Sequence, residues 1–323
     1  MTVKNDPRGC ALTLSSLASQ SRLPDEVIVV DGGSTDCTID VLRQYEQSIE
    51  PIRVISAAGA NIARGRNIAS AAAGGEIIAT IDAGCRAEND WLFSLLRPFQ
   101  DDASTEFVAG FYEIDARSLF EKVVGLATMR GQLEPVDAEN FNPSGRSMAL
   151  RKSLWERAGG WPDWIDFSED TLFDHKIRRM GVRWQFCGDA LVHWRPRSSL
   201  RGLARQFYNY GTGRGNTQID AKSFLYNLRN VLIVLLACGL CVATPWGFVV
   251  LTAAVAYFFV WAFHEKSVRI AGRTGRRAGY PLSLCVHWVV MLSNLAGYLA
   301  GTWQRLRDRR RYDYQMRVYL AGT

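Results

Sequence analysis

The sequence lacks two features that are typical of exported proteins. Its seven cysteines have no repeating spacing, whereas disulfide-rich secreted domains depend on such a framework. The N-terminal residues contain no apolar stretch that resembles a signal peptide. Cys238 and Cys241 form a C-x-x-C in an apolar stretch without Asp, Glu or His nearby, which favours packing residues over a redox or zinc site. We therefore expect a catalytic part that faces the reducing cytosol.

Acidic residues are scarce in the last third of the chain. Residues 228–323 contain 12 Lys and Arg against 3 Asp and Glu, whereas residues 1–227 contain 26 against 29. The net charge of +6 therefore belongs to the C-terminal third, which also holds the long apolar runs. Basic residues beside apolar runs favour an anionic lipid surface as the partner and argue against DNA or RNA.

The first half of the chain alternates short apolar runs with helical patterns. We predict strands at 26–31, 52–57 and 76–82, and helices at about 9–21, 38–45 and 61–73. This alternation is typical of an α/β fold with a mainly parallel, Rossmann-like sheet and flanking helices. Ligands of such sheets bind beyond the carboxyl ends of the strands, where Asp31 and Asp82 lie. Residues 1–6 are short and polar, so we expect a truncated first strand.

Three apolar runs in the last third predict membrane helices. Residues 231–243 and 247–263 are predicted to form a transmembrane hairpin. The run 282–301 is interrupted by polar residues and is predicted to lie at the interface or to re-enter the membrane. Two basic segments, 266–277 and 305–311, both favour the cytoplasmic side. We therefore predict a catalytic domain at 1–223 and a membrane-associated helical region at 224–323, in a multi-pass protein of the cytoplasmic membrane.

Two loops that follow predicted strands carry side chains suited to a nucleotide. In DGGSTDCT (31–38), the glycines permit a tight turn and leave Asp31 at the ligand edge of the sheet. In GANIARGRN (59–67), Arg64, Arg66 and Asn67 lie at the start of a helix. A carboxylate can bind a base or a ribose, and guanidinium groups bind phosphate oxygens. An ordinary turn and solvated surface arginines are the alternative explanations.

The stretch SEDTLFDHKIRRMG (168–181) predicts an amphipathic helix with Glu169 and Asp170 in its first turn. Acidic residues also favour helix starts for electrostatic reasons alone. The preceding AGGWPDWIDF (158–167) contributes Trp161 and Trp164. Their rings either stack on a sugar acceptor or anchor the loop by hydrophobic contact.

These stretches, in this order, resemble the family 2 glycosyltransferases, which have the GT-A fold. The resemblance covers about 1–215 and implies an inverting transfer from a nucleotide-diphosphate sugar to an acceptor hydroxyl. It implies that Asp170 is the general base that takes the acceptor proton, with Glu169 beside it. The residues that it places at the nucleotide sugar are Asp31 at the nucleobase, Arg64, Arg66 and Asn67 near the nucleotide, and Asp82 by the ribose and the metal.

One part of the family's pattern is missing from this chain. The family usually offers Asp-x-Asp to a divalent cation, whereas this sequence has Asp82, Ala83 and Gly84. By resemblance, Mg²⁺ or Mn²⁺ would be held by Asp82 and by His193, with diphosphate and water oxygens completing the shell. A structural histidine at a strand end is the alternative for His193.

We therefore expect a membrane-anchored inverting glycosyltransferase with its catalytic domain in the cytosol. Its partners would be a nucleotide-sugar donor, a lipid-linked or cell-surface polysaccharide acceptor and the membrane, with no nucleic acid. Two alternatives remain. A non-catalytic membrane protein with the same fold is consistent with Gly84. A nucleotidyltransferase would need a Gly-rich phosphate loop near the first strand, which this sequence does not show.

Overall fold

The computed structural model describes residues 1–48, 51–129, 131–139, 141–219, 221–244, 246–257 and 262–321. The chain divides into two compact units, and each is discontinuous in sequence. The first unit consists of Met1–Glu113, Val136–Arg195 and Asp313–Thr323, and the second of Ile114–Pro135 and Pro196–Tyr312. This division does not follow the predicted regions 1–223 and 224–323, because 114–135 and 196–223 group with the C-terminal helices.

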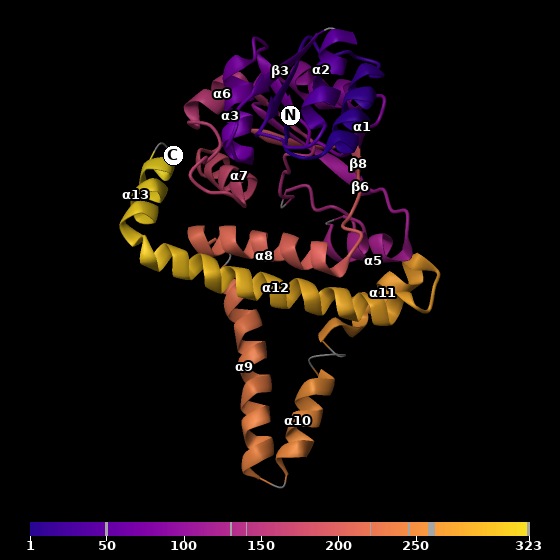
Figure 1. Cartoon of the computed structure of the whole chain (residues 1–323), viewed down its shortest axis with the longest axis vertical. Helices are drawn as coiled ribbons and strands as arrows, with labels where there is room; N and C mark the ends of the chain where they lie inside the picture. The colour runs from indigo at the N-terminus through magenta and orange to yellow at the C-terminus, as the bar shows by residue number, and fades with distance from the viewer. Residues whose placement is uncertain are drawn as a thin grey trace. The chain divides into compact units, whose positions relative to one another are not determined.

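The first unit contains two sheets, and helices pack around them (Figure 1). β1 (Thr2–Val3), β2 (Val27–Asp31) and β3 (Ile52–Ser56) pair in parallel in that order. The other sheet has the order β4-β7-β6-β8-β5. Its pairs β4 with β7, β6 with β7 and β5 with β8 run antiparallel. Its strands are β4 (Ile77–Thr80), β5 (Cys85–Ala87), β6 (Phe107–Ile114), β7 (Met148–Arg151) and β8 (Trp184–Trp194).

The helices of the first unit are α1 (Pro7–Ala18), α2 (Thr38–Ser48), α3 (Ile62–Ala72), α4 (Trp91–Asp101), α6 (Lys152–Arg157) and α7 (Glu169–Arg179). α1 begins at Pro7, where a fixed φ suits the first helical position. Asp6 caps α1 by accepting a hydrogen bond from Gly9 N, and Asn61 caps α3 in the same way from Arg64 N. The predicted strands and helices of residues 9–82 are confirmed, with ends that differ by up to three residues.

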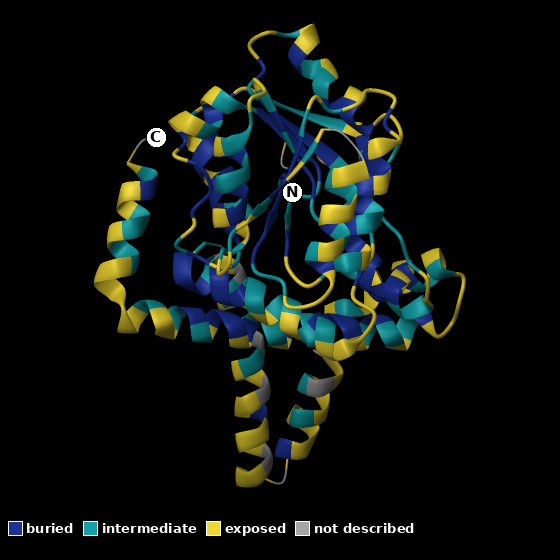
Figure 2. Cartoon of the chain, turned by 45° about the horizontal axis from the view of Figure 1, so that its top comes forward, coloured by how far each residue is buried: buried dark blue, intermediate teal, exposed yellow. Residues whose placement is uncertain are grey.

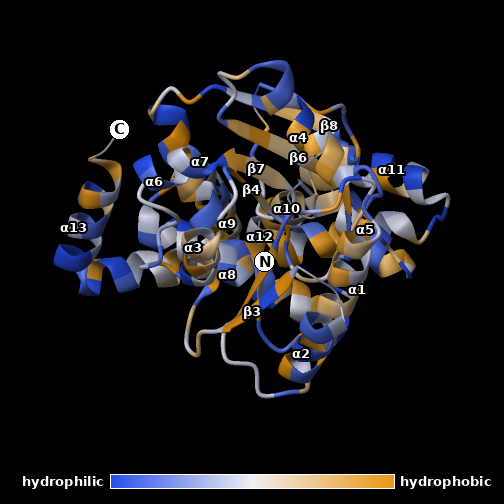
Figure 3. Ribbon diagram, turned by 90° about the horizontal axis from the view of Figure 1, so that it is seen from above, coloured by the Kyte–Doolittle hydropathy of each residue, from blue (hydrophilic) through white to orange (hydrophobic). Residues whose placement is uncertain are grey.

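β2 explains why the ligand edge of the sheet carries a carboxylate. All five of its residues are buried, and Val29 and Val30 are 0% and 1% exposed. A strand covered on both faces reads as a continuous apolar run, and such strands appear apolar in Figure 3 and buried in Figure 2. The run ends at Asp31, which is therefore delivered to the carboxyl edge of the strand.

The second unit is helical. It contains α5 (Leu119–Thr128), α8 (Leu200–Thr217), α9 (Ala221–Ala243), α10 (Gly247–Ala256), α11 (Ala262–Thr274) and α12 (Gly279–Arg307), and α13 (Arg309–Leu320) begins in it and ends in the first unit. Figure 1 shows α8 and α12 side by side, with α9 and α10 extending away from them as a pair. Apolar side chains on this pair are widely exposed, including Leu236 at 69%, Val242 at 93% and Phe248 at 68%.

Four glycines bring α8 and α12 into backbone contact. Gly211 and Gly215 of α8 lie against 294–302 of α12, and Gly297 and Gly301 of α12 lie against 208–216 of α8. A Cβ added to Gly301 would overlap the carbonyl oxygen of Thr212. Small residues four apart on both helices permit this approach, as in close helix pairs within membranes.

We expect Gly301→Ala to destabilise the second unit by about 1–3 kcal/mol, because the added methyl group overpacks a backbone contact. The measurement is detergent-solubilised unfolding followed by circular dichroism. Gly272→Ala in α11 is the matched control, since nothing lies within 4 Å of a Cβ at that position. Equal unfolding midpoints for the two variants would contradict the glycine packing.

α12 is the one helix in the described part of the chain that is long and apolar enough to cross a membrane, by length and composition alone. Within its apolar window, 39% is buried inside the protein, and buried core helices meet the same criterion. A shorter apolar helix covers Phe224–Leu240. The predicted span 247–263 includes 258–261, which lie outside the described residues.

Candidate functional site

Arg66 joins two of the predicted motifs in one buried cluster. Its Nη1 donates to Oε1 of Glu169 and its Nη2 donates to Oδ1 of Asp82, both at 2.8 Å. The side chains of Arg66 and Glu169 are 7% and 8% exposed, and that of Asp82 is 33% exposed. α3 supplies the arginine, the segment after β4 supplies Asp82, and the start of α7 supplies Glu169. The planar guanidinium therefore fixes two carboxylates from distant parts of the sequence.

Gly145 leaves the space that the Arg66 guanidinium occupies. A Cβ on Gly145 would overlap Nη2 and Cζ of Arg66. Because two carboxylates already hold the guanidinium, it has little freedom to move aside. The carbonyl of Gly145 also accepts a hydrogen bond from Thr80 Oγ1 at 3.2 Å. The 144–147 loop is therefore built against the cluster, a role that the sequence analysis missed.

α7 starts from a strained residue and presents both predicted acidic residues. Ser168 precedes the helix with φ 64°, a left-handed conformation that is uncommon outside glycine. Glu169 and Asp170 occupy the first turn, and Asp170 Oδ1 accepts a hydrogen bond from Thr171 N at 2.8 Å. Asp170 is only half-buried, and its charge acts on Arg66 and Glu169. It is therefore the more open of the two carboxylates.

Mutual charges set the protonation of the cluster. Burial alone would lower the pKa of Arg66, but Asp82, Glu169 and Asp170 raise it well above its usual range. Burial opposes the ionised form of Asp82, yet Arg66 and Arg146 hold the pKa of this carboxyl below its usual range. Burial and the charge of Asp170 outweigh Arg66 at Glu169 and raise its pKa to about 7.

This raised pKa predicts a pH-dependent loss of stability. The folded protein keeps a proton on Glu169 that the unfolded chain releases near pH 4.5. The proton on Glu169 therefore contributes on the order of 1–3 kcal/mol to the free energy of unfolding. This stabilisation is complete below pH 4.5, falls as the pH rises, and is lost above about pH 7. Unfolding by urea between pH 4 and 8 measures this slope. Glu169→Gln should flatten it, and an unchanged slope in that variant would contradict the assignment.

Arg146 is a further cationic residue that the sequence analysis missed. Its charge is one of the causes of the lowered pKa of Asp82. Its guanidinium lies over the ring of Trp194, 4.2 Å from the centroid, and over that of Tyr112 at 5.5 Å. Its Nη1 donates to Ser144 Oγ at 2.9 Å. In the sequence, Arg146 is a single arginine after Ser144 and Gly145, and nothing near it indicates that its charge acts on Asp82.

The carboxylate of Asp31 is hydrogen-bonded within its own turn. Its Oδ2 accepts hydrogen bonds from Gly33 N and Ser34 N, each at 3.1 Å, and its Oδ1 accepts from Ser34 Oγ at 2.5 Å. The residue is 4% exposed, and Gly33 adopts φ 88°. The carboxylate therefore shapes the 31–34 turn, and its predicted contact with a nucleobase stays a prediction.

Asn67 and Trp161 fasten the loop before α7. Asn67 Oδ1 accepts hydrogen bonds from Trp161 N at 2.8 Å and from Trp155 Nε1 at 3.2 Å, and its Nδ2 donates to the carbonyl of Trp161 at 2.8 Å. Trp161 is 1% exposed and stacks on Phe173 with centroids 4.9 Å apart. These contacts favour a hydrophobic anchor at Trp161 over an acceptor contact, and a structural role for Asn67.

Trp164 and Arg64 have more open positions. Trp164 is half-buried, so its predicted contact with an acceptor stays a prediction. Arg64 is exposed at the start of α3. It lines a cavity of about 540 Å³ together with Trp155 and Gly160. Its position near a nucleotide likewise stays a prediction.

The residues proposed for a metal ion do not form a ready-made site. His193 Nε2 lies 2.5 Å from Glu88 Oε1, which favours the structural alternative. Gly84 adopts φ 87°, a conformation that side chains rarely adopt, so the backbone here disfavours a second carboxylate. Within the described ranges, no three His, Cys, Asp or Glu side chains form a group that could hold a metal ion. Of the two residues predicted to hold the metal, Asp82 keeps a partly exposed carboxylate, and its role as a metal ligand stays a prediction.

Comparison with known proteins agrees with this architecture. The sequence model of Glycosyl transferase family 2 matches residues 1–157. A succinoglycan biosynthesis protein, ExoA, from Rhizobium meliloti is 26% identical over 91% of this chain and 89% of its own length. A validoxylamine A glucosyltransferase from Streptomyces hygroscopicus subsp. limoneus is 34% identical over 64% of this chain, but this covers only 43% of the relative.

A solved structure shows the same fold. It is a mannosyltransferase from Pyrobaculum calidifontis in complex with GDP-mannose and Mn²⁺, with a TM-score of 0.57 and 18% identity over 94% of this chain and 86% of its own. The parallel strands β1–β3 and the family match over residues 1–157 agree with one another. Residues 1–157 therefore match the family 2 glycosyltransferases, the fold is GT-A, and the chain is a glycosyltransferase.

Proposed function

We propose that the protein is an inverting glycosyltransferase that moves one sugar from a nucleotide-diphosphate sugar to a lipid-linked or cell-surface polysaccharide acceptor. The supporting observation is the Arg66 cluster. Asp82, Glu169 and Asp170 come from two separate motifs, and Arg66 gathers them at one place. The relative named for succinoglycan biosynthesis supports a glycan as the final product.

In the proposed reaction, Asp170 accepts the proton of the acceptor hydroxyl. The acceptor oxygen forms a bond to the anomeric carbon while the bond from that carbon to the diphosphate oxygen breaks. The nucleoside diphosphate leaves with the electron pair of the broken bond, and the proton remains on Asp170. A single displacement of this kind inverts the anomeric configuration. Asp170 suits the role because it is more open than Glu169.

The departing diphosphate needs positive charge. Arg146 and Arg64 are the proposed contacts for its oxygens. Asp82 would hold a divalent cation, which stabilises negative charge on the leaving group when bound. Arg66 is less suited to the diphosphate, because Asp82 and Glu169 already occupy both of its terminal nitrogens.

The second unit is the proposed membrane anchor on the cytosolic side. α9 and α10 expose long apolar side chains, including Leu235 at 59% and Trp246 at 78%. Arg305, Arg307 and the 309–311 run supply positive charge suited to anionic lipid headgroups. Multiple crossings of the membrane and a lipid-linked acceptor are part of this proposal.

A screen of nucleotide sugars tests the proposed function. The purified full chain would be incubated with each donor, with and without Mn²⁺ or Mg²⁺, and release of the nucleoside diphosphate measured. We expect one donor class to be hydrolysed in a cation-dependent way. Absence of hydrolysis with every donor would contradict the proposal. Activity that survives chelation would remove the metal role of Asp82.

A further inference from the structure

Tyr319 packs α13 into the first unit. Its hydroxyl donates to the carbonyl of Gly160 at 3.0 Å, in the loop before α7. Asp313–Thr323 and this loop belong to the same unit. Tyr319 is 8% exposed, and it is the one buried residue of α13, which lies wholly within the described ranges. A residue 159 positions away in the sequence therefore holds the loop that precedes α7.

The ring of Tyr319 also covers a buried cation on α7. Lys176 Nζ lies 4.3 Å from the ring centroid, and the residue is 4% exposed. Its ammonium group forms no hydrogen bond or ion pair within the described part of the chain, and burial lowers the pKa of this group. The face of an aromatic ring attracts a cation most strongly where water is excluded. Tyr319 therefore contacts the 158–168 loop with its hydroxyl and α7 with its ring.

α3 holds other points of the same loop. Asn61 Nδ2 donates to the carbonyls of Asp163 and Ile165, at 2.9 Å and 3.1 Å. Asn67 holds Trp161 through its side-chain amide. The loop is therefore bound by α3 and by α13 together.

The hydrogen bonds of the Asp170 carboxylate lie within α7. It accepts from Thr171 N at 2.8 Å and from Thr171 Oγ1 at 3.5 Å. Among the described residues, it forms no hydrogen bond to a group outside that helix. The place of this carboxylate therefore depends on the place of α7 itself, which Tyr319 contacts through Lys176.

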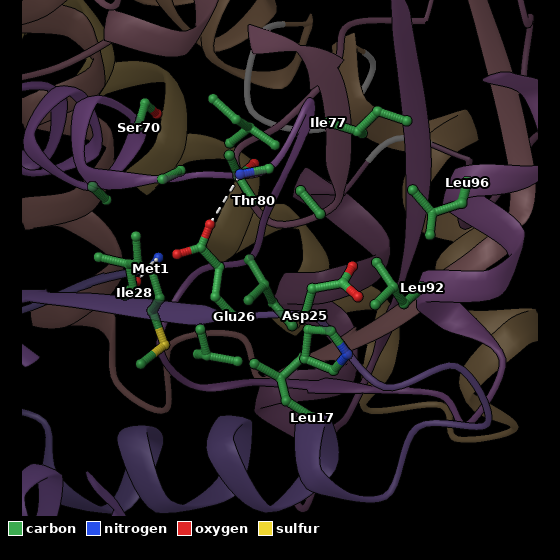
Figure 4. A pocket seen from close by; sticks show the side chains of 18 of the residues that line it. Met1, Leu17, Asp25, Glu26, Ile28, Ser70, Ile77, Thr80, Leu92 and Leu96 are labelled. Atoms are coloured by element: carbon green, nitrogen blue, oxygen red, sulfur yellow. Dashed lines mark hydrogen bonds between the residues drawn. The ribbon is translucent and has the colours of Figure 1, made fainter. Parts of the chain in front are cut away.

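A large cavity of the first unit is separate from these contacts. Figure 4 shows this cavity, of about 720 Å³, with Ser70 of α3, Ile28 and Ile77 on its walls. Among the described residues, none of 158–179 lines it. A change at Tyr319 therefore reaches the site through the loop and α7, and not through this cavity.

We propose that Tyr319 is a positioning residue for sugar transfer, because it ties the 158–168 loop to α7 and thereby sets where the Asp170 carboxylate lies. This inference rests on the proposed function, in which Asp170 is the base. A general base must lie within hydrogen-bond reach of the proton that it accepts. A small displacement of such a group slows the chemical step while the donor still binds. Loss of the Tyr319 hydroxyl should therefore lower kcat and leave the KM for the donor unchanged.

Tyr319→Phe tests the proposal in the full chain, because it removes the hydroxyl and keeps the ring over Lys176. We expect kcat to fall by about 10-fold, since misplacing a catalytic group by about 1 Å can cost about 10²-fold. Tyr314→Phe is the matched control, because Tyr314 lies on the same helix and is 63% exposed. It should transfer sugar at the rate of the unchanged protein.

A double variant separates positioning from a general loss of structure. If Tyr319 acts through Asp170, Tyr319→Phe should have little further effect on kcat in a chain that already carries Asp170→Asn, because residues that act as a unit are not additive. An equal fold loss of kcat in both backgrounds would show that Tyr319 only stabilises the fold and would overturn the proposal. An unchanged kcat in Tyr319→Phe would overturn it as well.

Hydrogen exchange distinguishes failure of this inference from failure of the proposed function. The amides of Trp161 and Leu172 are hydrogen-bonded, one in the loop and one in the first turn of α7. Both should exchange faster in Tyr319→Phe than in Tyr314→Phe, whether or not sugar is transferred. Equal exchange in the two variants would overturn the role of Tyr319 even in an active enzyme. Full transfer by Asp170→Asn would instead contradict the proposed base, and with it the positioning of that base, although faster exchange would still show that Tyr319 anchors the loop.

Discussion

Replacing Asp170 with Asn is expected to lower kcat for sugar transfer by about 10²–10⁴-fold, the usual contribution of a positioned base. The amide keeps the size of the side chain and can still accept the hydrogen bond from Thr171 N. The fold and the affinity for the donor should therefore be largely retained. Transfer kinetics and donor binding by calorimetry, measured on the same preparation, separate the two effects.

Asp189→Asn is the matched control for this variant, because Asp189 is exposed on β8. It should transfer sugar at the rate of the unchanged protein. Retained transfer in Asp170→Asn, together with loss of transfer in Glu169→Gln, would move the role of base to Glu169. Its pKa of about 7 would suit that role.

The strands whose ends carry residues of the candidate site could be predicted from the sequence. Strands in the interior of a sheet appear in the sequence as continuous apolar runs. These runs were enough to predict the positions of β2 and β4. Asp31 was predicted at the end of its strand and lies there. The mostly antiparallel pairing of the second sheet was not predicted, because hydrophobic patterns do not specify the partner of a strand.

The contacts within the site were harder to predict. Arg66 and Glu169 are 103 residues apart, and nothing local to either indicates that they bond. The fit of Arg66 against Gly145 depends on the same tertiary approach. A tryptophan that stacks on a sugar and one that stacks on Phe173 give the same sequence signal. Only burial distinguishes them, and it favours the loop anchor for Trp161.

Arg66→Met is expected to have the second large effect, on stability as well as on transfer. It removes the cation between Asp82 and Glu169 and leaves Glu169 buried without a partner charge. Breaking a buried pair in this way costs about 3–5 kcal/mol. Urea unfolding at pH 7.5 measures the loss. Arg64→Met, two residues earlier on the same helix but exposed, should change stability by less than about 0.5 kcal/mol.

The destabilisation by Arg66→Met has two possible causes, unpaired carboxylate charge and lost packing, and further variants distinguish them. If uncompensated carboxylate charge is the cause, the double variant Arg66→Met with Glu169→Gln should be more stable than Arg66→Met alone. The single variant should recover stability as the pH falls and Glu169 takes up a proton, which should happen above pH 7 because Arg66 no longer lowers the pKa of Glu169. Arg66→Lys should lie between, because an ammonium group carries the charge but cannot bond both carboxylates with a planar fork. A double variant no more stable than Arg66→Met alone would show that Arg66 acts by filling space, and that the charge balance of the cluster does not hold Asp82 and Glu169 together.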